Sequence, residues 1–330
     1  MTPLRPEVTL RGLTRADLPD VVALARAIEA EDRTDEHYNL ADFEEEYADP
    51  LLDPERDWIG AYVGGDPVGY VQVVPRSPSE GQLKMYSGGG VHPARRGRGI
   101  GDLLVRAMVA RVHERHRAHP DLEAVLLGTG LTSDERQRRL FARHGLLPDR
   151  YNLVLGVEPL VPVAPPHLPP GLRIRGYDPA LDGDALRVAH NRAFLGQVPN
   201  FSTWDEGMWR HWVTGNRNFR PDLTFLVVDS EGAIAAYVQT CVYDAVLEAT
   251  GKHEAFIARV GTLPEHRGKG LASALLGHTL EAARTAGMDR ACLDVDSDNP
   301  SGAVGVYERV GFALEKHFTD YKLAVPPITG

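Results

Sequence analysis

The chain has only two cysteines among its 330 residues, Cys241 and Cys292, and they lie far apart. Neither belongs to a C-x-x-C pair or has a histidine companion, so the sequence predicts neither a disulfide framework nor a zinc site. Both lie in apolar, strand-like segments, where a cysteine behaves as a small buried hydrophobic residue. We therefore expect two buried thiols and no bound metal.

Long hydrophobic runs and excess positive charge are also absent. No apolar run reaches 18 residues, and the segment after Met1 lacks the charged-then-apolar order of a leader peptide. Only five of the 36 basic residues are lysines, which we interpret as a compositional bias without functional meaning. The net charge of −10 argues against nucleic acid or an anionic membrane as a partner. We expect a cytoplasmic protein.

Two glycine-rich loops are present, Val91–Gly101 and Val260–Ala272, each between an apolar strand-like segment and an amphipathic helix. Glycine removes side chains where a helix N-terminus presents unpaired N–H groups, and these donors form a pocket for phosphate together with the helix dipole. His266, Arg267 and Lys269 would add cationic contacts. A chain that builds this loop twice is predicted to bind a phosphorylated ligand.

The spacing within the loops fits neither G-x-G-x-x-G nor G-x-x-x-x-G-K-[ST]. Both loops match R-x-x-G-x-[GA], which resembles the acyl-CoA pyrophosphate loop of the GCN5-related N-acetyltransferase superfamily. The alternative is a glycine-rich turn before a surface helix. The resemblance implies that the cofactor, acetyl-CoA, is bound in the second half by Val260, Gly261, Thr262, Arg267, Gly268, Lys269, Gly270, Leu271 and Ala272, and in the first half by Val91, Arg96, Gly97, Arg98, Gly99, Ile100 and Gly101.

The order of predicted elements repeats. Each half reads β-α-α-β-β-β-α-β-α-β, and the loop prolines Pro93 and Pro264 mark corresponding positions. Residues 158–171 contain six prolines, which favours an extended, semi-rigid segment and forbids a helix. We predict an N-terminal domain at 1–157, a linker at 158–171 and a C-terminal domain at 172–330. The predicted fold class is α+β, with a mixed, mostly antiparallel central sheet flanked by helices in each domain.

Residues with a proposed chemical role follow from the same resemblance. In the second half, Asn299, Ala303, Tyr307, Gly311 and Phe312 match the family pattern after the next strand. The match implies that Asn299 contacts the pantetheine arm and that Tyr307 is the general acid that protonates the CoA sulfur. In the first half, Phe141 and Ser133 stand at the tyrosine and asparagine positions. The alternative for Tyr307 is a half-buried tyrosine that packs on the sheet.

The general base is less well defined. Glu254, close to the strand that leads to the second loop, could take a proton directly or through water. Asp244 and Glu248 compete for this role, and all three could instead be solvated carboxylates.

Acceptor specificity is implied by resemblance to lie in the first two helices and the late strands. In the second half this points to Asn191, Phe194, Phe201 and Trp204, although tryptophans in this region could equally pack in the core. In the first half, the acidic stretch from Glu29 to Glu46 could attract a cationic amine, or could be a solvated face.

The sequence thus predicts a tandem acetyl-CoA-dependent N-acyltransferase with a mycothiol synthase-like layout, whose second domain is catalytic and whose partner is a small-molecule amine. The alternative is a non-catalytic protein that only holds acyl-CoA. The identity of the amine, the length of the acyl chain and the oligomeric state stay open.

Overall fold

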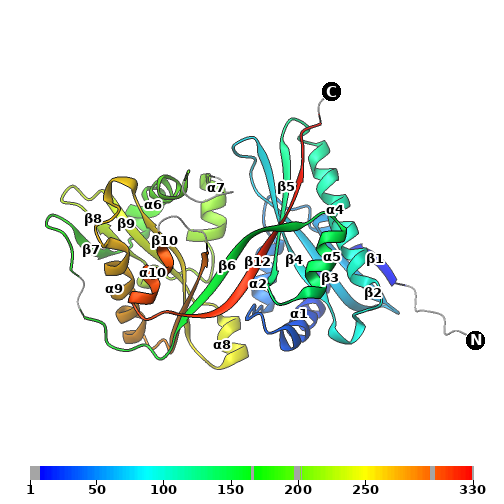
Figure 1. Ribbon diagram of the computed structural model, residues 1–330, viewed down its shortest axis with the longest axis horizontal. Coiled ribbons are helices and arrows are strands. Elements are labelled where there is room, and N and C mark those ends of the chain that lie inside the picture. Colours follow the sequence, from blue (N-terminus) through cyan, green and yellow to red (C-terminus); the bar gives the residue numbers. More distant parts are fainter. Residues whose placement is uncertain (1–7, 165–166, 197–200, 202, 298–301, 329–330) are drawn as a thin grey trace, which may run out of the picture. The chain divides into compact units, whose positions relative to one another are not determined.

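The computed structural model of the chain describes residues 8–164, 167–196, 201, 203–297 and 302–328 (Figure 1). The chain forms two compact units. Unit 1 contains Met1–Arg150 and Phe318–Gly330, and unit 2 contains Tyr151–His317. Among the described residues, no helix is both long and apolar enough to cross a membrane.

Apart from the short helices α3 and α8, the elements follow the predicted order in both halves. The first half contains β1 (Val8–Gly12), α1 (Leu18–Asp32), α2 (Leu40–Tyr47), α3 (Pro54–Asp57), β2 (Trp58–Val63), β3 (Asp66–Pro75), β4 (Gln82–Val91), α4 (Ile100–Arg117), β5 (Glu123–Leu131), α5 (Glu135–Arg143) and β6 (Leu147–Val157). The second half contains β7 (Arg173–Gly176), α6 (Pro179–Phe194), α7 (Glu206–Trp209), β8 (Phe225–Val228), β9 (Ile234–Cys241), α8 (Asp244–Thr250), β10 (Glu254–Thr262), α9 (Leu271–Thr285), β11 (Arg290–Asp296), α10 (Ala303–Arg309) and β12 (Ala313–Val325).

Local sequence signals explain several of these boundaries. Thr14 and Asp17 form a capping box before α1, with the Thr14 backbone N–H donating to Asp17 over 2.8 Å. Gly145 and Gly311 have φ angles of 82° and 101° and follow α5 and α10, where the left-handed conformation that ends a helix favours glycine. Helix α8 was not predicted, because its seven residues are too few to show a helical repeat.

Each unit is built on one mixed sheet with helices on both faces. In unit 1 the strand order is β1-β2-β3-β4-β5-β12, and in unit 2 it is β6-β11-β10-β9-β8-β7. In unit 2, a core cluster containing Leu271 and Leu275 of α9 covers one face, and a second cluster containing Leu186 of α6 and Trp209 of α7 covers the other. Side chains that alternate along β9 and β10 therefore face either α9 or α6 and α7.

The two parallel strand pairs separate part-way along their length. Strand β4 pairs with β5 only from Gln82 to Ser87, and β10 pairs with β11 only from Glu254 to Phe256. Past these points β4 and β10 continue to pair with β3 and β9 on their other side, as far as Val91 and Thr262. Each strand consequently has a stretch before its glycine-rich loop with no strand on the side of its parallel partner.

The domain boundaries differ from those predicted, because the last strand of each half crosses into the other unit. Strand β6 pairs with β11 through residues 152–157, and β12 pairs with β5 through residues 318–325. These are the long green and red strands of Figure 1. Residues 151–157 thus belong to unit 2 and residues 318–330 to unit 1. The ladder that completes each sheet is set by pairing partners distant in sequence, which the predicted order of elements does not reveal.

The proline-rich segment is not a free linker. Val163 donates its backbone N–H to Glu281 of α9 over 3.1 Å, and Leu160, Val163 and Leu168 pack against the core cluster of unit 2. As predicted, the described part of 158–171 contains no helix.

The strand exchange predicts that a mutation near the C-terminus destabilises the N-terminal half. Tyr321 of β12 is 1% exposed and packs edge-on against Phe141 of α5, with ring centroids 5.1 Å apart. Tyr321→Ala should therefore lower the stability of unit 1 by about 3–5 kcal/mol, the usual cost of removing a buried aromatic ring. We expect faster hydrogen exchange of the amides of β5 and α5, measured by mass spectrometry.

Leu314→Ala is the matched control, because Leu314 lies on the same strand within unit 2 and is 50% exposed. It should change stability by less than about 0.5 kcal/mol. Faster exchange confined to residues 151–317 in Tyr321→Ala would contradict the exchange of strands.

Candidate active site

The two glycine-rich loops have the same backbone conformation. Gly97 and Gly99 have φ angles of 74° and 86°, and Gly268 and Gly270 have φ angles of 71° and 77°. An added Cβ atom at any of the four would meet nothing within 4 Å, so the space beside the loops is open. Glycine is therefore favoured by the left-handed backbone, and the loops leave an open space that no side chain of their own fills.

This open space lies at the N-terminus of a long helix in each unit. Gly99 is the N-cap of α4 and Gly270 is the N-cap of α9, and no side chain caps either helix. The first N–H groups of a helix have no acceptor within it, and they favour an anion together with the helix dipole. Ile100 and Leu271 anchor the helices, since both side chains are buried in the cores. Both loops thus have the backbone arrangement expected of a phosphate site, and binding of a phosphate there stays a prediction.

The loop arginines hold the loops in place, and their predicted role as phosphate contacts stays a prediction. Arg96 forms two hydrogen bonds of 2.6 Å with Asp32 of α1 and donates to the Val91 carbonyl over 3.0 Å. Arg267 donates to the carbonyls of Thr262 and Ala193 over 3.3 and 3.0 Å. Each arginine thereby ties its loop to the preceding strand and to the first long helix of its unit.

Lys269 is also tied to its loop. Its Nζ donates to the Glu265 carbonyl over 2.9 Å, so the ammonium group is bound to the loop itself. Leu271 and Ala272 start α9, and their contribution to a ligand would come from backbone N–H groups.

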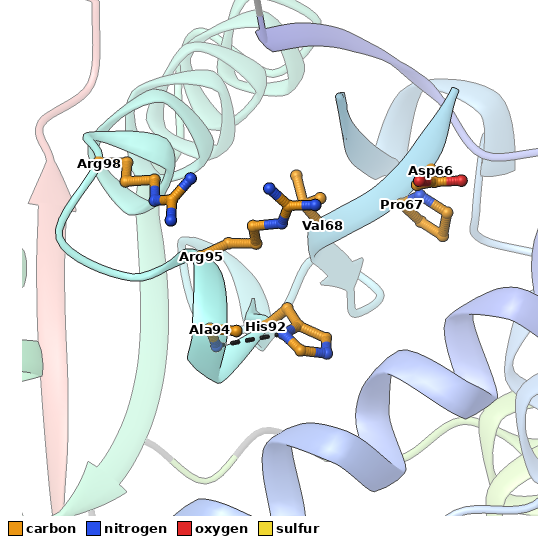
Figure 2. A pocket seen from close by; sticks show the side chains of 7 residues that line it. All are labelled: Asp66, Pro67, Val68, His92, Ala94, Arg95 and Arg98. Atoms are coloured by element: carbon orange, nitrogen blue, oxygen red, sulfur yellow. Dashed lines mark hydrogen bonds between the residues drawn. The ribbon is translucent and has the colours of Figure 1, made fainter. Parts of the chain in front are cut away.

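A pocket of about 440 Å³ lies beside the loop of unit 1. Figure 2 shows the side chains of Arg95 and Arg98 around it, together with His92 from the same turn and Asp66 at the start of β3. Two guanidinium groups beside a helix N-terminus suit a polyanionic ligand. At corresponding positions unit 2 has His266 and Lys269, so the loop of unit 1 carries the stronger cationic contacts.

The segments Gly89–Val91 and Val260–Thr262 lie where the parallel strands have separated. Backbone groups that point toward β5 or β11 there have no strand partner. Gly261 lies opposite Tyr237 of β9, and an added Cβ would come within 2.2 Å of that ring. The tyrosine ring thus fills the space over Gly261 and leaves the backbone of this segment as its functional part.

Tyr307 lies on α10 in the core cluster that contains the start of α9. It is 8% exposed and packs edge-on against Phe312. Burial, and secondarily Asp294, raises the pKa of the phenol well above 10. No hydrogen-bond partner of its hydroxyl is found among the residues that the structure describes. Tyr307 is therefore a protonated donor. Asn299, its predicted companion, lies outside the described residues.

The tyrosine position of unit 1 contains an apolar ring. Phe141 of α5 is 8% exposed and belongs to the core cluster of that unit, while Ser133 is exposed just before the helix. Unit 1 thus keeps the packing without a group that can donate a proton.

The structure does not bring Glu254 to the loop. Glu254 starts β10 and forms an ion pair with Arg290, which also bonds Glu315 over 2.7 Å. At about 3.3 Å per strand residue, Glu254 is roughly 20 Å from Gly261. Asp244 lies on α8, is mostly exposed and pairs with Arg217 over 3.3 Å. Glu254 therefore has a structural ion pair, and this placement argues against its predicted role as the general base.

The predicted acceptor residues gather around a histidine that the sequence did not single out. His190 of α6 is 2% exposed and is surrounded by the rings of Phe194, Phe201, Trp204, Trp209 and Tyr237. Its Nδ1 lies 2.6 Å from the Tyr237 hydroxyl, and burial lowers its pKa to about 3. Its spacing on the apolar face of α6 was the available signal.

Asn191 is committed to the backbone. Its amide bonds both the N–H and the carbonyl of Trp204, each over 2.9 Å, and so fixes the segment after α6. Its predicted direct contact with substrate stays a prediction.

Arg259 and Gln239 were also missed. The Arg259 guanidinium lies 4.9 Å from the Trp204 ring centroid and donates to Gln239 Oε1 over 2.8 Å. Sequence reasoning passed over Arg259 because it lies inside an apolar strand.

Unit 1 has a buried carboxyl group in the matching region. Glu46 of α2 accepts a hydrogen bond from Gln72 of β3, and its Oε2 is buried without a partner. Burial, and secondarily Asp42, raises the pKa of Glu46 to about 8. This residue belongs to the acidic stretch that was predicted to attract a cation or to be solvated.

Two carboxylates and one imidazole in unit 1 have the composition of a metal ligand set. Within the described part of the chain, ligand atoms of Glu29, Asp35 and His37 lie within 4.8 Å of one another. The Glu29 carboxylate already accepts the backbone N–H groups of Thr34 and Asp35 over 3.0 and 2.8 Å. We interpret the group as a loop closure and assign no metal to it.

Comparisons with known proteins agree with this geometry. The acetyltransferase (GNAT) family matches residues 20–146 and 184–312. A mycothiol acetyltransferase from Thermobispora bispora is 30% identical over 261 residues, 76% of this chain and 78% of that protein. Another from Salinispora tropica is 28% identical over 324 residues, 94% of each chain.

Solved structures show the same fold. A GCN5-related N-acetyltransferase from Sphaerobacter thermophilus has a TM-score of 0.77 at 24% identity and covers 97% of this chain and 96% of its own. A tandem GNAT protein from the clavulanic acid biosynthesis pathway has a TM-score of 0.69 at 18% identity and covers 96% and 98%.

The two family matches, one in each half, each contain one glycine-rich loop and the parallel strand pair that separates beside it. The chain therefore belongs to the acetyltransferase (GNAT) family as a tandem member, an N-acetyltransferase that uses acetyl-CoA.

Proposed function

We propose that unit 2 is the catalytic unit and transfers an acetyl group from acetyl-CoA to the amine of a small molecule, with Tyr307 as the general acid. One observation carries the proposal. Unit 2 combines an open phosphate loop with a buried, protonated phenol, whereas unit 1 has the loop and a phenylalanine, Phe141.

The residues of unit 2 fit acetyl-CoA. The open space beside Gly268 and Gly270 leaves room for a pyrophosphate, because a Cβ at either position would meet no protein atom within 4 Å. The unpaired edge at Val260–Thr262 offers backbone groups to an extended, amide-containing arm. Acetyl-CoA supplies an activated acetyl group as a thioester. The same features in unit 1, with Arg95 and Arg98 beside its loop, support binding of CoA there without turnover.

The reaction requires one bond to form and one to break. The amine nitrogen bonds the acetyl carbon, and the carbon–sulfur bond breaks. N–H groups of Val260–Thr262 would stabilise the negative charge on the carbonyl oxygen, and Tyr307 would donate its proton to the departing sulfur. The segment Ile257–Thr262 contains no carboxylate. We infer that the amine proton leaves to water and that the phenol regains its proton from solvent.

The acceptor class follows from the relatives. Proteins named mycothiol acetyltransferase match most of this chain, which supports a small-molecule amine as the acceptor and a cytoplasmic location. A screen for CoA release with aminosugar–cysteine conjugates, aminoglycosides, polyamines and peptide N-termini tests this class. Absence of CoA release with every amine would favour a protein that only holds acyl-CoA.

Gly270→Val should weaken CoA binding to unit 2. A β-branched residue is strained at a φ of 77°, and its side chain would occupy the open space where a pyrophosphate oxygen approaches the backbone. We expect the dissociation constant for CoA, measured by calorimetry, to rise by roughly 10-fold or more.

Two variants control for this effect. Gly99→Val should affect only the binding step assigned to unit 1. Gly251→Val places the same strain, at a φ of 72°, at the end of α8, before the start of β10 and at the opposite end of that strand from the loop, and should leave CoA affinity unchanged. Unaltered affinity in Gly270→Val would remove the loop from the cofactor site.

Tyr307→Phe should lower kcat by roughly 10²-fold, the scale of one general acid, with little change in CoA affinity. Only a hydroxyl is removed, so packing against Phe312 is kept. Because burial raises the phenol pKa, the protonated acid persists as pH rises. Wild-type kcat should show no decline due to Tyr307 below about pH 10.

Tyr151→Phe is a suitable control, because Tyr151 is 48% exposed. Phe141→Tyr alone should not create activity in unit 1. Near-normal kcat in Tyr307→Phe, with chemistry shown to be rate-limiting, would return Tyr307 to a packing role.

Glu254→Gln should reduce stability and spare catalysis. The change removes one charge from the ion pair with Arg290, which keeps Glu315, so we expect a loss of about 1–3 kcal/mol in the free energy of unfolding. We expect kcat to stay within roughly threefold, since a lost general base costs about 10²-fold or more. A large fall in kcat without a change in thermal stability would restore Glu254 as the base.

A further inference from the structure

Arg259 is a cation whose contacts in the described part of the chain are with uncharged groups. Of its five N–H donors, one reaches Gln239, and Trp204 stacks on the guanidinium plane. No carboxylate lies within ion-pair distance of Arg259 among the described residues. Gln239 is 1% exposed, and its Nε2 is buried without a partner. A partly buried, unpaired cation is unfavourable, so the site is electrostatically incomplete without an anion.

The position of Arg259 places it beside the reacting group. It directly precedes the Val260–Thr262 segment. Val260 packs against the core cluster of α9, whereas Gly261 faces Tyr237, which belongs to the cluster of α6 and α7. Arg259, stacked on Trp204, lies on this second face. Arg259 thus lies on the same face as Trp204, one of the predicted acceptor residues, and we take this face as the acceptor side.

Unit 1 provides an internal comparison. Both units carry Tyr-Val-Gln on the strand next to the loop strand, and the glutamines lie opposite Gly88 in unit 1 and Arg259 in unit 2. In unit 1 the glutamine bonds Glu46, a carboxyl group. In unit 2 it bonds a guanidinium. The same framework thus holds a carboxyl group in one unit and a guanidinium in the other, so the fold does not require an arginine there.

We propose that Arg259 is a specificity-determining residue that binds a carboxylate on the acceptor, so that the acceptor of unit 2 is an amine of the amino-acid type. This inference rests on the proposed acetyl transfer in unit 2. The planar guanidinium matches a carboxylate with two parallel hydrogen bonds. A second positive charge on the acceptor would be repelled by Arg259, so polyamines are excluded as good acceptors.

The test compares acids with their neutral amides. Initial rates of CoA release are measured with L-leucine against L-leucinamide and with L-phenylalanine against L-phenylalaninamide. The acids and amides differ in amine pKa, so the measured quantity is the acid-to-amide ratio of kcat/KM in wild type divided by that in Arg259→Gln, where this difference cancels. We expect this quotient to be roughly 10 to 100, the value of a charge-assisted hydrogen bond.

Matched variants separate recognition from folding. Arg259→Lys keeps the positive charge but loses the planar pair of N–H donors, and it should retain part of the preference for the acid over the amide. Arg173→Gln removes an exposed arginine of β7 and should leave the quotient at one. KM for acetyl-CoA should be unchanged in all three variants. If Arg259→Gln fails to fold, the Arg259→Lys quotient decides.

Three results would overturn the inference. A quotient within threefold of one means that Arg259 does not read a carboxylate. A preference seen only for O-phosphoethanolamine over ethanolamine assigns a phosphate instead. Efficient acetylation of spermidine would contradict the exclusion of polyamines as good acceptors.

Failure of the proposed acetyl transfer would look different, because wild type would release no CoA with any acceptor. Calorimetry of N-acetyl-L-leucine against N-acetyl-L-leucinamide, with CoA present, then decides the carboxylate preference independently. Equal affinity of the two probes for wild type would overturn the inference.

Discussion

The structure depends on unpaired backbone N–H groups at the start of a helix, kept accessible by glycine. A side chain at Gly270 would strain the left-handed backbone and fill the open space beside it. An N-capping side chain would accept hydrogen bonds from the N–H groups that are otherwise available to a ligand. Everything nearby holds this arrangement in place. Arg267 ties the loop to β10 and α6, and Leu271 anchors α9 in the core. An anion is then the group that completes the helix end.

The two units share this device and differ in what surrounds it. Unit 1 has the more cationic loop, with Arg95 and Arg98 beside its pocket, but an apolar ring at Phe141. Unit 2 has a weaker cationic loop and the phenol of Tyr307. Binding of a phosphorylated ligand and donation of a proton are separable, because the first uses backbone groups and the second needs one hydroxyl in a low-dielectric site.

The exchange of the last strands links the two halves of the chain. Strand β12 supplies Tyr321 to the core of unit 1, beside Phe141, and β6 completes the sheet of unit 2 against β11. Neither half of the sequence therefore contains a whole unit. A duplicated fold would in principle survive the loss of one copy, but here each copy needs a strand from the other to satisfy its edge.

The sequence by itself determined the features that depend on local chemistry. Glycine spacing gave both loops, capping residues such as Thr14 and Gly311 placed helix ends, and alternation placed most strands. Tertiary structure alone decided which strands pair across the chain, because a β ladder joins partners far apart in sequence. It also decided the state of charged groups. Glu254 is neutralised by Arg290, whereas Arg259 has no described acidic partner, and only packing distinguishes a committed charge from an available one.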